Sequence, residues 1–476
     1  MPAALSPGEL RLTALLDELR LEPGGSATIG GRDPVLACRY PLGEAAAAIH
    51  AAVGVTAARL GEDRGLPAQR VAVDVRHAAA SLRGFLDQVV DGETLDPDPT
   101  GRLAGVGLFA ARDGWVQTYG AFPPLEERTL AVLRCRGDRE AIARAVSTRG
   151  AEELVDALVA AGAPGALVLS AAEWEAHPQG RALRELPVVL VERIGDAPPE
   201  PLPAPVDPRP LDGVRVLDLT RIIAGPACGR TLAEHGADVL QVGAPRLHEV
   251  RRAAIETAPG KRRTSLDLAD GHDLARLLAL VPRSDVVCQN ARPGVLDRRG
   301  LGAERLAEVR PGIVHVSTDT YGHVGPWRSR PGFEPLAQCS TGWADEHRDA
   351  DGRPTIVPAL PCDYATGYLA ALGAMVALRR RATEGGSWQV RTSLARTAMW
   401  LRDQPGRVDP TGAPGTPAAS TGDLRIRLDG PFGAVDQLAP VVRMSGTPAR
   451  WATPGEPAGS SAPEFGDESR GPAPRR

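Results

Sequence analysis

Apolar and polar residues alternate along residues 213–319 in a rhythm of short strands and amphipathic helices. Residues 213–219, GVRVLDL, predict a buried strand, and CGRTLAEHGA predicts the helix that follows it. The alternation continues through ADVLQV, TSLDL, DGHDLARLLALVP, SDVVCQN, GAERLAEVRP and GIVHVST. Strands that alternate with single helices predict an α/β fold with an open, parallel, Rossmann-like sheet and flanking helices, which binds ligands at the carboxyl ends of its strands.

Two segments of biased composition divide the chain. Residues 198–210, PPEPLPAPVDPRP, predict a stiff linker, because proline interrupts both helix and sheet. Residues 446–476 are rich in Pro, Gly, Ser and Ala and predict a disordered tail. We therefore expect a first part at 1–197, the linker at 198–210, the Rossmann-like domain at 211–445 and the tail.

The sequence also contains an internal repeat. Residues 364–398 align without a gap on residues 45–79, and both copies predict an Ala-rich helix, a turn, a strand and a second helix. Gly373 falls on Gly54 and Val390 on Val71 in this alignment. Just before the aligned range, Asp363 falls on Glu44.

Charge and composition exclude several classes of partner. The chain has 55 Lys and Arg against 59 Asp and Glu, so no basic field gathers nucleic acid or an anionic membrane. The most apolar helical stretch, 368–378, is much shorter than the roughly 20 residues of a membrane span. The amino terminus lacks the pattern of a secretory signal, which predicts a cytoplasmic protein. The 6 cysteines form no CxxC pair, so neither a disulfide framework nor a metal site is expected.

Common catalytic motifs are incomplete in this chain. There is no G-x-S-x-G elbow, and Arg252 stands where a zincin motif beginning at His248 needs its second histidine. A phosphate loop ending at Lys261 would need glycine at Ile255. The turn after the first strand lacks the G-x-G-x-x-G spacing of a dinucleotide site.

Five segments of the second half, in order, resemble the family III coenzyme A transferases of the CaiB/BaiF type, which include formyl-CoA and carnitine-CoA transferases. They span roughly residues 210–400 and read PLDGVRVLDLTRIIAGPACGRTLAEHGADVLQV, GKRRTSLDL, SDVVCQNARPGVLDRRGLG, PGFEPLAQCSTG and PCDYATGYLAALGAMVAL. The resemblance implies a CoA transferase, with a smaller α+β domain beside the Rossmann-like one.

The first half is similar to the later portion of the same family. DGWVQTYGAF resembles its small-domain region, and EWEAHPQGRAL resembles a segment near its usual carboxyl end. The chain therefore reads as two incomplete family units fused head to tail. Because family members are interlocked homodimers, the resemblance implies an interlocked architecture, as a homodimer or an internally fused pseudo-dimer.

The resemblance implies that Asp363 is the nucleophile. A positioned carboxylate attacks the thioester carbonyl of an acyl-CoA, and the released CoA then converts the mixed anhydride into an aspartyl-CoA thioester. A helix start favours this chemistry, because its N–H groups and dipole stabilise negative charge. The partners are then an acyl-CoA and a small carboxylic acid, with CoA esters as substrates and no permanently bound cofactor.

The same resemblance implies the residues that contact CoA. They lie after predicted strands or in the GFE segment, and they are Ile223, Ala224, Leu266, Asp267, Leu268, Ala269, Asn290, Ala291, Arg292, Arg298, Phe333 and Glu334. Two departures weaken the match: Gly243-Ala244-Pro245 replaces a Val-Glu-Pro or nearby arginine, and Ala258-Pro259 replaces an asparagine before GKR.

Two alternatives remain open from the sequence. An acyl-CoA racemase or isomerase of the same family uses a histidine where Phe333 stands, and phenylalanine accepts no proton, so Glu334 or another base would have to serve. A non-catalytic CoA-ester-binding pseudoenzyme is the second alternative. Glu44 is interpreted as a relic of the nucleophile. The alternatives are that Glu44 is a second nucleophile or a pairing element.

Overall fold

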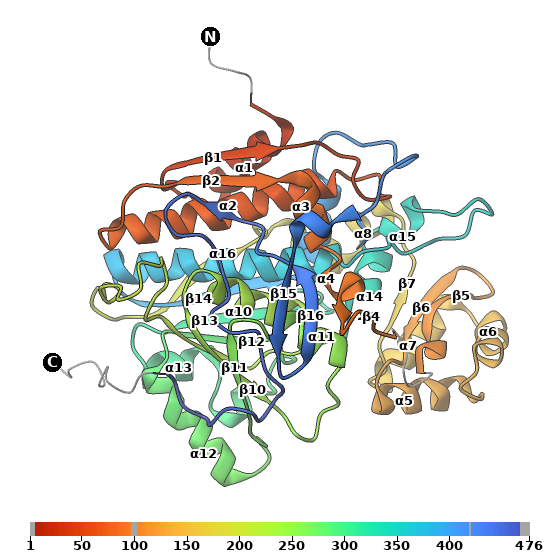
Figure 1. The fold of residues 1–476 in the computed structure, drawn as a ribbon. Helices are drawn as coiled ribbons and strands as arrows, with labels where there is room; N and C mark the ends of the chain where they lie inside the picture. The colour runs from red at the N-terminus through yellow and green to blue at the C-terminus, as the bar shows by residue number, and fades with distance from the viewer. Residues whose placement is uncertain (1–4, 97–101, 418–419, 467–476) are drawn as a thin grey trace.

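A seven-stranded sheet forms the centre of the computed structural model, which describes residues 5–96, 102–417 and 420–466 (Figure 1). Its strand order is β11-β10-β9-β12-β13-β14-β8, and every pair is parallel except β14 with β8. The strands are β8 (Leu190–Gly195), β9 (Arg215–Asp218), β10 (Asp238–Gly243), β11 (Lys261–Ser265), β12 (Val286–Gln289), β13 (Val314–Asp319) and β14 (Ser387–Ser393). The predicted Rossmann-like sheet is confirmed.

Helices connect the successive parallel strands. They are α10 (Ala224–Glu234), α11 (Arg251–Thr257), α12 (Gly271–Leu280) and α13 (Ala303–Val309). The strand predicted at TSLDL begins earlier, because β10 pairs with residues 261–265 and ends at Gly243. Leu266 and the residues after it therefore lie beyond the carboxyl end of β11, where ligands of such sheets bind.

The longest helix, α16 (Pro361–Glu384), is buried along most of its length. Pro361 occupies its first turn and Gly385, with φ 72°, follows its last residue, so both ends carry residues that suit a helix boundary. In Figure 1 it lies beside α2 (Leu42–Asp63), and it also packs on α10, β13 and β14. Its neighbours in the chain are α14 (Glu334–Ser340), α15 (Trp343–Glu346) and α17 (Leu394–Arg402).

Three smaller sheets surround this core. One contains β1 (Ser26–Gly30), β2 (Arg70–Asp74) and β17 (Arg443–Met444). The second contains β15 (Arg425–Gly430), β16 (Gly433–Leu438), β3 (Val89–Val90) and β4 (Glu93–Thr94). The third contains β5 (Val106–Ala110), β6 (Trp115–Tyr119) and β7 (Gly165–Leu167), and forms a small α+β domain with α5 (Pro123–Leu133), α6 (Arg139–Ser147) and α7 (Ala151–Ala160).

The remaining elements of the described residues belong mostly to the first half. The helices are α1 (Pro7–Leu19), α3 (Val75–Ser81), α4 (Gly84–Asp87), α8 (Ala171–Ala176) and α9 (Pro178–Arg184). The 3₁₀ turns are η1 (Arg102–Gly105), η2 (Val281–Arg283), η3 (Asp297–Arg299) and η5 (Gly422–Leu424). Residues 196–214, which include the proline-rich segment, contain no helix or strand. None of the helices in the described ranges has the length and apolar character needed to cross a membrane.

The prediction that the chain is disordered from residue 446 is wrong for residues 446–466. This segment runs along the free edge of β11, where the N–H groups of Gly459 and Ser461 donate to the carbonyl of Arg263. Phe465 is buried in the core beneath the sheet. Backbone pairing with an edge strand and one large apolar side chain hold the segment although its composition is biased. The rest of the predicted tail, 467–476, lies outside the described residues.

A buried ion pair links the edge strand β11 to β9 and α10. Lys261, the only lysine in the chain, is fully buried, and its Nζ lies 2.9 Å from Asp218 Oδ2. The same Nζ lies 2.7 Å from the carbonyl oxygen of Pro226. One side chain therefore ties β11 to β9 and α10.

Lys261→Met should destabilise the protein by about 3–5 kcal/mol, because it leaves the Asp218 carboxylate buried without its cation. Chemical denaturation measures this loss. The double variant Lys261→Met/Asp218→Asn should regain much of the lost stability, since it removes both charges. Equal stability of Lys261→Met and the unchanged chain would contradict this role.

Candidate active site

The start of α16 is held by one carboxylate from another helix. Glu334 Oε1 accepts the N–H of Cys362 at 3.2 Å, and its Oε2 accepts the N–H of Asp363 at 2.5 Å. Gln338 donates its side-chain amide to Oε1 at 2.8 Å, which fixes the orientation of the carboxylate. Glu334 thus lies beside the predicted nucleophile and satisfies backbone groups that a helix start leaves unpaired.

The Asp363 carboxylate lies at the start of α16 and is not paired with another group of the described residues. Asp363 is half-buried, and its carboxylate makes no hydrogen bond or ion pair within the described parts of the chain. Burial raises its pKa well above the ordinary value, and the nearby Glu334 carboxylate raises it further. A carboxylate with a raised pKa is more basic and hence more nucleophilic when ionised.

Close packing brings the loop after β9 to this helix. A Cβ on Gly367, one turn beyond Asp363, would lie 2.4 Å from the carbonyl oxygen of Ala224, so only glycine permits this contact. Ile223 and Ala224, both predicted to contact CoA, therefore lie at the start of α10 against α16. The preceding Ile222 has φ 74°, a strained value for a β-branched residue, and such strain gathers at functional loops.

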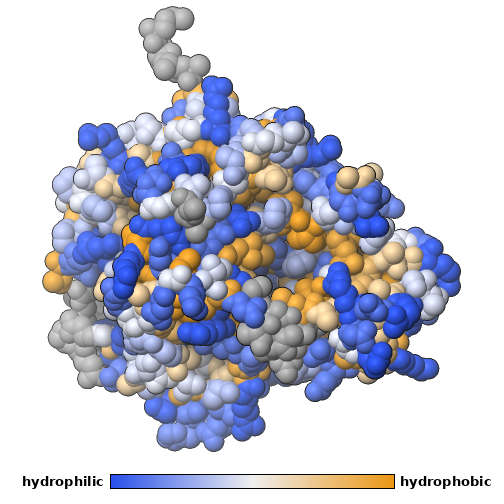
Figure 2. Space-filling view, turned by 45° about the vertical axis from the view of Figure 1, so that its right-hand side comes forward, coloured by the Kyte–Doolittle hydropathy of each residue, from blue (hydrophilic) through white to orange (hydrophobic). Residues whose placement is uncertain are grey.

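Aromatic side chains from the small domain lie near Asp363. Tyr119 at the end of β6 stacks on Phe333 with ring centroids 4.0 Å apart, and its pKa is raised by burial and by the charge of Asp363. Phe122 stacks on Phe333 at 5.8 Å and meets His248 edge-on at 6.2 Å. Figure 2 shows apolar surface where the small domain, on the right, meets the body. The region around Asp363 is thus partly aromatic.

The other predicted CoA contacts lie at the carboxyl ends of β11 and β12. Asn290 joins the loops after β12 and β9, because its side-chain amide exchanges two hydrogen bonds with the backbone of Arg221, at 2.8 and 3.1 Å. Arg292 and Arg298 are exposed, and no carboxylate pairs with either guanidinium in the described ranges. Both cations are therefore free to bind phosphate.

The residues after β11 make more contacts within the protein than Arg292 and Arg298 do after β12. Leu266 is buried in the core, and Asp267 pairs with Arg246. Leu268 accepts a hydrogen bond from Arg299 on its carbonyl oxygen, and Ala269 is exposed. The structure brings this loop to the predicted edge of the sheet, and the CoA contacts themselves stay predictions.

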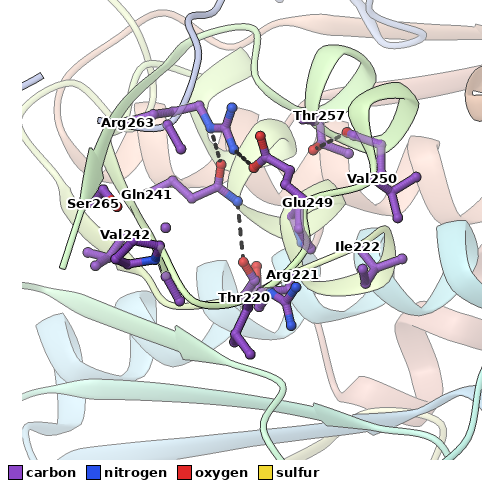
Figure 3. Close-up of a pocket in the computed structure, with 18 residues that line it drawn as sticks. Thr220, Arg221, Ile222, Gln241, Val242, Glu249, Val250, Thr257, Arg263 and Ser265 are labelled. Carbon is purple, nitrogen blue, oxygen red and sulfur yellow. Dashed lines mark hydrogen bonds and ion pairs between the residues drawn. The ribbon is translucent and has the colours of Figure 1, made fainter. Parts of the chain in front are cut away.

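A cavity of about 330 Å³ opens at the ends of β9, β10 and β11 (Figure 3). Inside it Arg263 contacts Glu249 and donates to Gln241 at 2.8 Å. Ile222 and Ser265 line it, next in sequence to the predicted contacts Ile223 and Leu266. The remaining lining residues are Thr220, Arg221, Pro226, Val242, Gly243, Ala244, Pro245, Leu247, Val250, Ala253, Ala254, Thr257 and Ala458.

The C-terminal segment lies against both departures from the family pattern. A Cβ on Gly243 would lie 3.0 Å from the methyl group of Ala458, so a valine there would collide with the segment. A Cβ on Gly455 would lie 2.8 Å from the backbone of Ala258, and the N–H of Gly260 donates to Thr453. These departures accommodate the packed segment.

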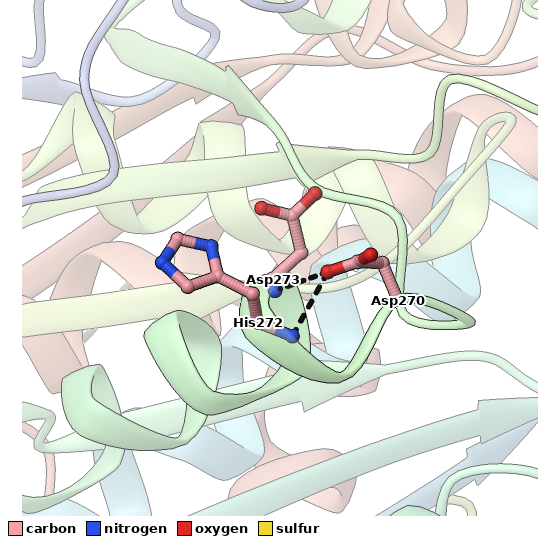
Figure 4. Close-up of side chains that lie close together, drawn as sticks. All are labelled: Asp270, His272 and Asp273. Carbon is pink, nitrogen blue, oxygen red and sulfur yellow. Dashed lines mark hydrogen bonds between the residues drawn. The ribbon is translucent and has the colours of Figure 1, made fainter.

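Asp270, His272 and Asp273 lie close enough together at the start of α12 to suggest a metal site (Figure 4). Hydrogen bonds at the helix start explain why these side chains are close together. Asp270 caps the helix by accepting the N–H groups of His272 and Asp273 at 2.8 and 3.0 Å. Asp273 accepts the N–H of Asp267 at 2.9 Å. The group reads as a helix cap.

Tyr119 was not predicted as a site residue, because nothing in DGWVQTYGAF places β6 beside α14 or near Asp363. The contact of Glu334 with the start of α16 was not predicted either, since the segment that holds Glu334 lies far from this helix start in sequence. The available signal was the Glu334-Pro335 dipeptide, because proline in the first turn of a helix marks its start.

The model of CoA-transferase family III matches residues 211–453. An acyl-CoA transferase of Gibberella moniliformis is 30% identical over 75% of this chain and 70% of its own length. The succinyl-CoA–L-malate CoA-transferase β subunit of Chloroflexus aurantiacus is 34% identical over 41% of this chain and 51% of its own. A formyl-CoA:oxalate CoA-transferase of Rhodopseudomonas palustris is 34% identical over 41% and 49%.

The chain also matches solved structures, two of which are as follows. Rv3272 of M. tuberculosis is 30% identical, with a TM-score of 0.39 over 41% of this chain and 57% of that one. A CaiB/BaiF family protein of Brucella suis is 27% identical, with a TM-score of 0.38 over 48% and 65%.

The chain belongs to CoA-transferase family III, as its sequence predicts. It spans 70% of the Gibberella relative and about half of the two bacterial enzymes. The Gibberella match covers 75% of this chain and therefore extends into the first half.

Glu334→Gln should lower the pKa of Asp363, because it removes a neighbouring negative charge that raises this pKa. Carbodiimide labelling at a series of pH values, read by mass spectrometry of the peptide that contains residue 363, follows the protonated carboxyl. Labelling should persist to a lower pH limit in the variant than in the unchanged chain. Glu308→Gln, on the exposed face of α13, is the control, and an upward shift in Glu334→Gln would contradict the assignment.

Proposed function

We propose that this protein transfers coenzyme A from an acyl-CoA thioester to a carboxylic acid, with Asp363 as the nucleophile. The proposal rests on the Asp363 carboxylate in the first turn of α16, which makes no hydrogen bond or ion pair within the described residues. This carboxylate lies next to the strand-end loops of a family III chain. The relatives named as transferases act on acyl-CoA, formyl-CoA or succinyl-CoA.

The proposed reaction passes through two mixed anhydrides and one aspartyl-CoA thioester. An Asp363 carboxylate oxygen attacks the thioester carbonyl carbon, the C–S bond breaks, and CoA leaves as its thiolate. The thiolate attacks the aspartyl carbonyl of the mixed anhydride, which releases the first carboxylate and leaves an aspartyl-CoA thioester. The acceptor carboxylate then forms a second anhydride with release of the thiolate, which attacks the acceptor's acyl carbon. The products are the new acyl-CoA and free Asp363.

Residues at the strand ends are proposed to hold CoA. The exposed guanidinium groups of Arg292 and Arg298 would bind phosphates, since arginine pairs well with phosphate oxygens. Ile223 and Ala224 would contact the pantetheine arm, because they lie between the sheet edge and α16.

The racemase alternative finds little support in the geometry. Phe333 has no titratable group, and both oxygens of Glu334 accept hydrogen bonds from the start of α16. A general base must be free to accept the substrate proton. Deuterium exchange at the α-carbon of a bound acyl-CoA tests this alternative.

Asp363→Asn should lower the transfer rate by roughly 10³-fold or more, because the amide cannot form the anhydride. Acyl-CoA affinity should be retained. The assay supplies a panel of acyl-CoAs and free acids and follows the products by mass spectrometry. Asp351→Asn, in an exposed loop, is the matched control. Unchanged transfer by Asp363→Asn would contradict the proposal, and absence of transfer by the unchanged chain across the panel would favour the pseudoenzyme.

A further inference from the structure

The internal repeat is present in the structure, element by element. When residues 45–79 are laid on residues 364–398, α2 falls on α16, β2 on β14 and α3 on α17. Asp74 and Ser393 then coincide, and each caps the helix after its strand by accepting the N–H of His77 or Arg396. The second helix therefore begins at the same position in both copies.

Strand neighbours repeat in the same way. β2 has a parallel neighbour, β1, and an antiparallel one, β17, just as β14 lies between parallel β13 and antiparallel β8. A Cβ on Gly54 would lie 2.7 Å from a methyl of Val71, and one on Gly373 would lie 2.4 Å from a methyl of Val390. Helix and strand approach closely at equivalent points of both copies.

The repeat extends to the carboxylate at the helix start. Asp33 accepts the N–H of Gly43 at 3.2 Å and the N–H of Glu44 at 2.8 Å. These are the positions in α2 that match the two N–H donors to Glu334 in α16. In both copies a proline follows the capping carboxylate, in Gly-Arg-Asp-Pro at 31–34 and Gly-Phe-Glu-Pro at 332–335.

Each copy also contacts the helix start of the other. The residues after α3 reach α16, where the N–H of Leu360 donates to Leu82 at 2.9 Å and the N–H of Phe85 donates to the Tyr364 hydroxyl at 2.7 Å. The residues after α17 reach the segment just before α2, where the N–H of Val408 donates to the carbonyl of Arg39 at 3.0 Å. Reciprocal contacts of this kind are characteristic of a two-fold interface.

The two carboxylates at the helix starts differ in their ion pairing. Arg11 of α1 donates to Glu44 Oε2 at 2.7 Å and to the carbonyl of Pro405 at 2.6 Å, and both charged side chains are buried. Glu44 is 6% exposed, whereas Asp363 is half-buried and pairs with no cation among the residues that the structure describes.

We propose that residues 26–85 together with β17 form a built-in partner unit for the catalytic half, and that Arg11 holds its equivalent carboxylate, Glu44, as a structural ion pair. The unit keeps the helix that packs on α16 but has only a three-stranded sheet, so the strand-end loops around Asp363 have no counterpart there. Each chain then has one reactive carboxylate, a consequence that rests on the proposed function.

A double-mutant cycle tests the ion pair. Arg11→Met and Glu44→Gln should each lower the thermal unfolding midpoint by several degrees, because each leaves a buried charge without its partner. The double variant should lose clearly less than the sum of the two. Arg20→Met, at the exposed end of α1, should leave the midpoint unchanged. Strictly additive losses would overturn the structural role of Arg11.

Labelling of the unchanged chain tests whether Glu44 is unreactive toward acyl-CoA. After incubation with each acyl-CoA of the same panel and hydroxylamine, the intact mass should show one hydroxamate per chain with the donors that are used, on the peptide that contains residue 363. A hydroxamate on the peptide that contains residue 44 would overturn the proposal. If neither peptide is labelled while Arg11 and Glu44 remain coupled in unfolding, the proposed function falls and the structural ion pair stands.

Discussion

The hydrogen bonds from the start of α16 to Glu334 are the contacts on which the site depends. They satisfy two N–H groups that the helix start leaves unpaired, and no hydrogen bond or ion pair engages the Asp363 carboxylate within the described parts of the chain. A helix start favours an ionised carboxylate, whereas burial and the neighbouring Glu334 charge oppose it. The raised pKa shows that the opposing effects prevail.

The order of strands and helices from 213 to 319 was predictable, because each strand is short, apolar and bounded by an amphipathic helix. The repeat was also visible, since Gly54 and Gly373 mark the same close approach of helix to strand. Asp363 came from resemblance to a family, because an aspartate in the first turn of a helix is otherwise an ordinary cap.

Contacts between distant segments were not predictable from local pattern. The C-terminal segment packs through backbone pairing with Arg263 and through Phe465, and neither leaves a periodic signal. Its position explains Gly243, which sequence alone presents only as a departure from the family. The ion pair between Arg11 and Glu44 joins α1 to α2, and no sequence motif predicts that these two helices pack together.

The most direct test of the account is a crystal structure of the Asp363→Asn variant with a bound acyl-CoA. The account predicts the thioester carbonyl carbon within about 3.5 Å of the residue 363 side chain, with the pantetheine arm passing Ile223 and the phosphates near Arg292 and Arg298. A thioester held elsewhere, with residue 363 out of reach, would contradict it.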